Sequence, residues 1–194
     1  MVRRYRTDPV DPNALDRILD AARRGPSAGF AQGVELIIVI SDAGRSRLAA
    51  EAHEADYTAR GFEPWLSAAP IHVVVTVDPS AYERRYAEPD KSTGVPVDRW
   101  PVPYWWVDAG AALMLILLAT AAENLAAGFL GSHAFGDLAA AVRLPPGREA
   151  IGVVTIGHEA DSHAVGSARR PRRPRSAVEH SEQWGIPRQP GQEH

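Results

Sequence analysis

The 194-residue sequence contains no cysteine, which excludes disulfide bonds, thiolate metal sites and cysteine nucleophiles. It also lacks a Walker loop, a G-x-G-x-x-G fingerprint and a G-x-S-x-G elbow, so it predicts no P-loop, no Rossmann phosphate site and no hydrolase nucleophile. The closest histidine pair, His158 and His163, lies in a polar segment without neighbouring carboxylates arranged as ligands, so we expect no metal site.

Strong charge of either sign is absent as well. The net charge is −3, which gives no reason to expect nucleic acid or an anionic membrane surface as a partner. The first residues, MVRRYRTDPV, contain no apolar stretch after the arginines, so they do not form a secretory signal and we expect a cytoplasmic protein. Apolar residues make up 45% of the chain and charged residues 23%, as in ordinary globular proteins.

The most distinctive stretch is the uncharged run Ala109–Ala122, AGAALMLILLATAA. It is shorter than the roughly 20 residues that cross a bilayer, and longer than a typical strand. Alanine, leucine and methionine favour a helix, and a helix that is apolar on every side must be buried all round. The run therefore predicts either a core helix or a helix between two subunits.

Periodicity and turn residues predict an alternation of helices and strands. Asp11 and Pro12 have the pattern of a helix cap followed by the first helical residue. The expected elements are a helix from Pro12 to before Gly25, a small-residue loop at 27–33, strands at 34–40, 71–77 and 151–156, a helix from Asp42 to about 56, the apolar helix to about 127, a turn at 129–132 and a short helix at 135–142. From the residues alone, this order indicates an α/β chain with a small sheet.

Residues 78–103 carry several prolines and aromatic residues and show no sustained period. A loop of this length inside a domain is usually functional or mobile, so we interpret 78–104 as a lid or insertion. Its aromatic residues, together with Trp105 and Trp106, either line a substrate pocket or pack in the core.

The last part of the chain, 161–194, is polar and rich in proline, and it cannot build a core of its own. It carries arginines at 169, 170, 172, 173 and 175. They have three interpretations: a solvated basic tail, a nucleic-acid or localisation patch, or a pair that grips a phosphate through forked hydrogen bonds.

Six short motifs occur in the order found in the nitroreductase-type flavoprotein family. They are Arg3-Arg4-Tyr5 with Pro9-Val10; Gly25-Pro26-Ser27-Ala28-Gly29-x-x-Gln32; Ala69-Pro70; Trp106-x-Asp108-x-Gly110; Thr155-Ile156-Gly157; and Arg170-x-Arg172-Arg173-Pro174 before Trp184. The chain resembles this family from about residue 2 to 184, and its segment Trp-Pro-Val-Pro-Tyr-Trp-Trp-Val-Asp is most similar to actinobacterial members.

The resemblance implies an α+β, three-layer sandwich in which helices flank a small mixed sheet. Residues 1–160 would form the FMN-binding core, and 161–194 an arm that wraps the partner subunit of an obligate homodimer. The long apolar helix would then be the interface helix, with FMN bound at the dimer interface.

The resemblance also assigns residues to the cofactor. It places Arg3 near the pyrimidine edge and ribityl chain; Pro26, Ser27, Ala28, Gly29 and Gln32 in a loop that covers the flavin from the partner subunit; Leu130 and Gly131 with backbone amides facing N5 and O4; and Arg170 and Arg172 at the phosphate. The substrate pocket would include Phe30, Trp100, Tyr104 and Trp105.

The sequence departs from the family pattern at two places. Phe30 stands where the loop usually has asparagine, which removes a polar contact near the ring. Met1 stands where the serine of an Arg-x-Ser-x-Arg motif is expected, so we expect the chain to begin at an internal methionine. Loss of one phosphate-binding arginine would weaken FMN binding by about 10–100-fold.

The implied activity is transfer of hydride from NAD(P)H through flavin N5 to a small organic acceptor, such as a nitroaromatic, a quinone, an enone or a biosynthetic intermediate. This chemistry belongs to the cofactor and needs no acid or base side chain, only positioning and electrostatics. The alternatives are a flavin- or deazaflavin-binding protein without NAD(P)H turnover, and a flavin-modifying or dehalogenating enzyme.

Overall fold

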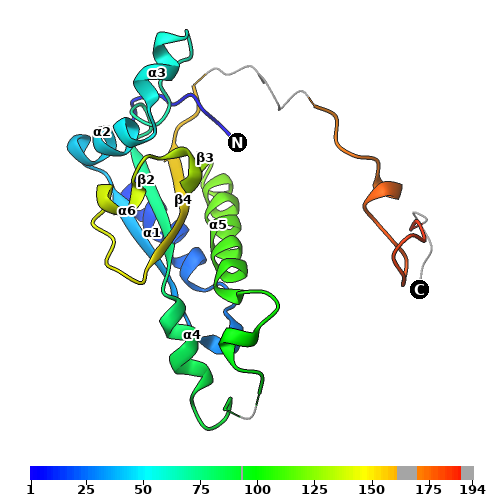
Figure 1. Ribbon diagram of the computed structural model, residues 1–194. Coiled ribbons are helices and arrows are strands. Elements are labelled where there is room, and N and C mark those ends of the chain that lie inside the picture. Colours follow the sequence, from blue (N-terminus) through cyan, green and yellow to red (C-terminus); the bar gives the residue numbers. More distant parts are fainter. Residues whose placement is uncertain (93, 161–169, 189–194) are drawn as a thin grey trace. The chain divides into compact units, whose positions relative to one another are not determined.

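The structure is a computed structural model that describes residues 1–92, 94–160 and 170–188 (Figure 1). The chain divides into two compact units, Met1–Ser162 and His163–His194. The first unit contains every helix and strand named below except a short 3-10 turn, η5 (Arg175–Ala177), which belongs to the second.

The first unit alternates helices and strands from its beginning. In chain order the elements are α1 (Pro12–Arg23), η1 (Ala28–Phe30), β1 (Val34–Val39), α2 (Asp42–Glu51), α3 (Glu54–Ala59), β2 (Ile71–Val77), α4 (Pro79–Tyr86), η2 (Val97–Arg99), α5 (Tyr104–Ala122), β3 (Ala126–Gly131), η3 (Ser132–Ala134), α6 (Leu138–Ala141) and β4 (Glu149–Gly157). The predicted start of the first helix is confirmed, because Asp11 accepts a hydrogen bond from the Asn13 amide and Pro12 is the first helical residue.

The four strands form one sheet in the order β1-β2-β4-β3. Every pair in this order is antiparallel, with Val34 opposite Val77, Ile71 opposite Ile156 and Ala126 opposite Gly157. The sheet of the described residues is therefore antiparallel throughout, and the expectation of a mixed sheet is wrong for this chain.

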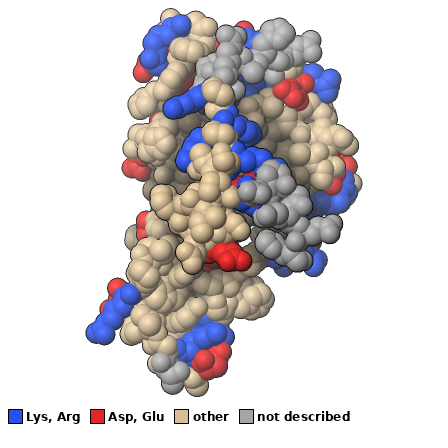
Figure 2. Space-filling model, turned by 90° about the vertical axis from the view of Figure 1, so that its right-hand side faces the viewer, with Lys and Arg blue, Asp and Glu red and all other residues tan. Residues whose placement is uncertain are grey.

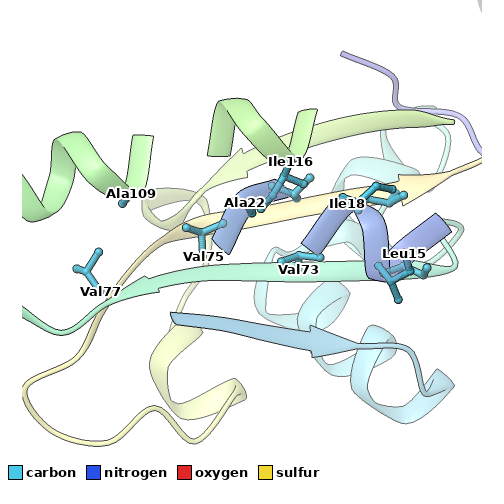
Figure 3. Packing of buried hydrophobic residues seen from close by; sticks show 11 residues of the cluster. Leu15, Ile18, Ala22, Val73, Val75, Val77, Ala109 and Ile116 are labelled. Atoms are coloured by element: carbon cyan, nitrogen blue, oxygen red, sulfur yellow. The ribbon is translucent and has the colours of Figure 1, made fainter. Parts of the chain in front are cut away.

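Helices cover both faces of the sheet, which confirms the three-layer sandwich. On one face α1 and α5 pack against the side chains of Val73 and Val75 on β2, with Ile18 and Ile116 between the layers (Figure 3). On the other face α2 and α6 pack against Val74 and Val153. All seven residues of β2 are buried, so this strand is the centre of both cores.

The apolar helix and the strand after it differ from the prediction. Helix α5 begins at Tyr104 and ends at Ala122, not near residue 127, and the segment interpreted as a turn at 129–132 belongs to β3 and η3. The sequence of β3, AAGFLG, has no β-branched residue, so local propensity gives no strand signal. Pairing with β4 along the sheet edge decides its conformation.

Three further helix predictions need correction. The expected helix from Asp42 to 56 is two helices, α2 and α3, separated at Ala52 and His53. Only Leu138–Ala141 of the expected helix at 135–142 is α-helical. The segment interpreted as an irregular lid begins with a regular helix, α4, whose Asp78 cap and Pro79 repeat the signal that was recognised at Asp11 and Pro12.

Helix α5 is only partly covered within the chain. Its inner side buries Ala109, Ala112 and Ile116, whereas Met114 and Leu118 are 51% and 61% exposed. By length and composition this 19-residue helix could span a membrane, whereas the 14-residue run seen in the sequence was judged too short. One such helix is weak evidence, since core helices of soluble proteins pass the same test. Its packing against α1 and the sheet accounts for its inner side.

His72 on β2 predicts a pH-dependent stability. Its ring is fully buried, Nε2 donates to the Leu66 carbonyl at 2.7 Å, and Nδ1 has no partner among the described residues. Burial lowers the pKa of His72 from 6.5 to about 4. Between these values the unfolded chain binds a proton that the folded chain does not, so stability falls as pH drops through this window.

We therefore expect the free energy of unfolding to fall by about 2 kcal/mol when the pH is lowered from 7 to 5, because of the lowered pKa of His72. Urea unfolding of the wild type and of His72→Gln at both pH values measures this contribution, because glutamine does not titrate. Parallel pH dependences of the two proteins would contradict the assignment.

Candidate functional site

The loop between α1 and β1 has an unusual backbone. Gly29, Phe30 and Gln32 all have positive φ, at 60°, 60° and 53°. Left-handed conformations are uncommon for residues other than glycine, and a run of them persists only where the surroundings impose it. The Ser27 hydroxyl accepts from the Gln32 amide at 3.0 Å, closing the loop, and Phe30 projects outward with 70% of its surface exposed.

A buried carboxylate, that of Asp108, binds the backbone of this loop. Asp108, on the first turns of α5, is 7% exposed, and its Oδ2 accepts from the Ala28 amide at 2.9 Å. The same oxygen accepts from the Tyr82 hydroxyl of α4 at 2.7 Å. Burial of the Tyr82 ring and, to a smaller extent, its hydrogen bond to Asp108 raise the pKa of this phenol. The hydroxyl therefore stays protonated and acts as a donor.

Helix α4 contacts the loop through Arg85 and Tyr86. Arg85 Nε donates to the Gly29 carbonyl at 2.7 Å, and its two terminal nitrogens bind both oxygens of Asp90, each at 2.7 Å. The Tyr86 ring lies against Gly29, where an added Cβ would approach its Cε2 to 2.7 Å. Glycine is therefore required at position 29 by both its φ and its neighbour.

The aromatic residues of 78–106 form contacts along the same region. Trp100 packs edge-to-face against Tyr86 on one side and Tyr104 on the other, with ring centroids 4.6 Å and 5.4 Å apart. Trp105 packs on Tyr82 and is partly buried in the core, with its Nε1 unpaired among the described residues. Trp100 and Tyr104 are thus close to the loop, and Trp105 supports it from inside.

An open cavity of about 600 Å³ lies beside the loop. Its apolar wall comes from α1 and β1 and includes Leu19 and Leu36, and its polar groups are Ser27, Gln32 and Asp108. Further polar groups come from α1, namely Asp16, Asp20 and Arg23, and Pro26 also lines the cavity. The cavity therefore joins the loop to the outer strand of the sheet.

The N-terminal segment lies at the other end of the sheet. The Val2 amide donates to Ala127 at 2.9 Å, and the Tyr5 hydroxyl bonds to Thr155 Oγ1 at 2.7 Å. Burial raises the pKa of Tyr5 to about 12, so this anchor stays protonated. Arg3 is exposed, with its guanidinium 5.4 Å from the centroid of Trp65, and it makes no ion pair within the described ranges. It is a free cation of the kind that binds phosphate or another anionic group.

The remaining predicted cofactor residues lie elsewhere. Leu130 and Gly131 end β3 and pair with Val153 and Gly152 of β4. Arg170 and Arg172 belong to the second unit, where both are exposed and form no ion pair with another described residue. By contrast, their neighbour Arg175 binds both oxygens of Glu179.

The predicted cofactor contacts of the first unit therefore lie at different places on the sheet. Residues 26–32 precede Val34 at one end of the sheet, whereas Arg3 lies beside Ala127 at the opposite end, about 20 Å away along the strands. Arg3 and Gly131 lie at the two ends of β3, along one edge of the sheet. The loop lies by the opposite edge strand, β1.

The comparison with family models identifies the family of this chain. Residues 1–158 match the model described as the nitroreductase family. The chain belongs to the nitroreductase family. The resemblance inferred from six short motifs is confirmed, and so is the family's sandwich fold.

Individual relatives agree with this assignment. A protein of Bacillus subtilis strain 168 named as an NAD(P)H-dependent FMN reductase is 28% identical over 188 residues, which cover 94% of this chain and 70% of the relative. The hypothetical oxidoreductase YcnD from Bacillus subtilis is 27% identical with a TM-score of 0.71, over 94% and 70% of the two chains. The NADPH:FMN oxidoreductase of Vibrio harveyi, solved with NAD⁺, has the same fold with a TM-score of 0.71 at 20% identity, over 94% and 73%.

Sequence reasoning missed the two groups that bind the loop at Ala28 and Gly29. Asp108 was recognised only as a motif residue, although a single carboxylate inside a long apolar helix signals a buried, hydrogen-bonded role. Arg85 carries no comparable signal, because its spacing to Gly29 is set only when α4 folds beside the loop.

Replacement of Gly29 by alanine tests how tightly the loop is held. We expect Gly29→Ala to lower the free energy of unfolding by about 2–4 kcal/mol, because left-handed strain adds to a clash with Tyr86. Gly61 is a matched control, since it also has positive φ but open space around its Cα, and Gly61→Ala should cost about 1 kcal/mol. Equal losses for the two variants in thermal or urea unfolding would show that Tyr86 does not confine the loop.

Proposed function

We propose that this protein is an FMN-dependent oxidoreductase that transfers hydride from NAD(P)H to a small organic acceptor. The observation that carries the proposal is a tightly held, left-handed loop at one end of the sheet together with Arg3 at the other, an arginine with no ion pair to any described residue. The nitroreductase family assignment and the names of the relatives support FMN as the cofactor and NAD(P)H as the reductant.

The described residues fit an FMN molecule chemically. Arg3 offers an exposed guanidinium without a carboxylate partner in the part of the chain that the structure describes, and Arg170 and Arg172 offer two more. When bound, FMN would supply the hydride chemistry itself. This chain's part is then to hold an anionic group with Arg3, to cover the cofactor with residues 26–32, and to present the backbone of Leu130 and Gly131.

We propose a homodimer built on α5. The outward side of this helix carries apolar or small residues at alternating spacings of four and three, namely Val107, Ala111, Met114, Leu118 and Ala121. This is the pattern of a helix-packing seam, and within one chain Val107, Met114 and Leu118 remain about half exposed or more. A second copy would cover the seam and bring the loop of one chain toward Arg3 of the other.

We also propose that the C-terminal arm predicted at 161–194 wraps the partner subunit, although its residues 161–169 and 189–194 lie outside the described residues. The second unit exposes Val178, Trp184 and Ile186, and none of its described residues, 170–188, is buried. Strand β1 is the outer strand of the sheet, and the cavity beside it has an apolar wall. The edge and the cavity are suitable receptors for such an arm.

The acceptor would bind near Phe30, Trp100 and Tyr104. These side chains are close to the loop, and they offer aromatic surface to a planar molecule. On the face of the protein shown in Figure 2, basic and acidic side chains lie side by side at the end that carries α4, as the ion pairs of Arg85 with Glu88 and Asp90 require. Because these charges are paired, we propose a small acceptor without strong net charge, reduced in the cytoplasm.

Purified protein should bind FMN and oxidise NADH or NADPH in the presence of menadione or nitrofurazone. We expect Arg3→Ala to weaken FMN binding by about 10–100-fold, as expected for loss of a charge-assisted hydrogen bond. Arg60 is the matched control, because it also lies over an aromatic ring, that of Tyr57, and Arg60→Ala should leave FMN affinity unchanged.

Flavin fluorescence titration and NAD(P)H oxidation rates measure these effects. A protein that binds no FMN would overturn the proposed function. A protein that binds FMN but oxidises neither nucleotide would instead be a flavin-binding protein without NAD(P)H turnover.

The dimer is tested at Leu118. We expect Leu118→Glu to weaken self-association by at least about 100-fold, because a carboxylate would be buried in an apolar seam without a partner. Phe62→Glu is the control, since Phe62 is similarly exposed at 63% but lies away from α5. Analytical ultracentrifugation should give a dimer for the wild type and Phe62→Glu and a monomer for Leu118→Glu; a monomeric wild type would refute the proposal.

A further inference from the structure

We propose that Asp108 and Tyr82 are positioning residues that join the loop Pro26–Gln32 to helix α4 as one unit. This inference rests on the proposed function, because the position that they set matters only if the loop covers a flavin. Neither residue needs to touch the cofactor, because Asp108 acts through the Ala28 amide and Tyr82 acts through Asp108.

The first argument is the arrangement of donors around one oxygen. Asp108 Oδ2 receives the Ala28 amide from the loop and the Tyr82 hydroxyl from α4, so a single buried atom connects three segments far apart in the sequence. Bonds to an ionised acceptor are stronger than neutral ones, and a buried carboxylate without its donors is costly. The three segments therefore move together or not at all.

The second argument is the isolation of this carboxylate. Asp108 is the single charged residue of α5 and lies one turn from its N-terminus, among Trp105, Ala109 and Ala112. A packing role at this site would be filled better by an apolar side chain of similar size, since desolvating a charge opposes folding. What the carboxylate provides, and an apolar residue would not, is an acceptor for the loop amide.

A third argument comes from the contacts on either side of the Ala28 amide. The Tyr82 ring lies so close to Gly33 that no Cβ fits there, and Arg85 binds the Gly29 carbonyl while holding Asp90. Helix α4 thus contacts the loop at Gly29 and Gly33, and Asp108 binds it at Ala28. The exposed Phe30 therefore lies in a loop whose position is coupled to that of α4.

Amide hydrogen exchange on the cofactor-free, full-length protein tests the connection directly. We expect Asp108→Ala to speed exchange of residues 27–33 by about 10–100-fold and Tyr82→Phe by about 10-fold, because each removes one anchor. Exchange of residues 109–122 should not change in either variant. Thr120→Val is the control: it removes a buried hydroxyl that bonds Ile116 on the same helix, and should leave the loop unaffected.

FMN affinity and rescue distinguish positioning from general stability. Asp108→Asn keeps an acceptor oxygen for both donors, so its FMN dissociation constant should stay within about threefold of the wild type, whereas Asp108→Ala should raise it about tenfold or more. With FMN saturating, Tyr82→Phe should raise the menadione KM about threefold to tenfold and leave kcat within twofold. Thr120→Val should match the wild type in both.

The outcomes separate the two proposals. If the wild type binds no FMN, the proposed function fails, while the exchange experiment still tests the anchored loop. If the wild type binds FMN but folded Asp108→Ala and Tyr82→Phe retain wild-type loop exchange and FMN affinity, the positioning role of Asp108 and Tyr82 is wrong.

Discussion

The fold depends on burying one side of a helix that has no polar side. Helix α5 packs Ala109 and Ile116 against the sheet, and α1 packs in the same layer (Figure 3). The central strand β2 is apolar enough to accept helices on both faces, so the first unit is a sandwich with two cores. The outward side of α5 is not buried by this packing. Its exposed Met114 and Leu118 are the main reason to propose that a second copy of the chain covers it.

The same helix carries the group that organises the candidate site. Asp108 lies where α5 meets α4 and the loop before β1, and its carboxylate receives donors from both. The apolar helix therefore does two separate things with different forces: hydrophobic contacts place it on the sheet, and one buried acceptor fixes the neighbouring loop to it. Left-handed residues at 29, 30 and 32 persist because this acceptor and Arg85 leave the loop no relaxed alternative.

Sequence reasoning succeeded where a local signal coincided with the final packing. The Asp11-Pro12 cap and the strands near residues 34, 71 and 151 were predicted, because capping and β-branched runs act locally. It failed at β3, whose alanines and glycines have no strand preference and are held by β4, and at α4, where proline and aromatic residues hid a capped helix. The antiparallel order of the sheet was not visible either, since strand adjacency is a long-range property.

The sequence by itself determined the family, the expected cofactor chemistry and the residues of the loop, because motifs in fixed order survive changes in the residues between them. Tertiary structure alone decided that Arg3 and the loop stand at opposite ends of one sheet, and that Asp108, Tyr82 and Arg85 converge on the loop. The physical reason is that spacing along a chain fixes local conformation, whereas which donor meets which acceptor depends on how separate elements pack.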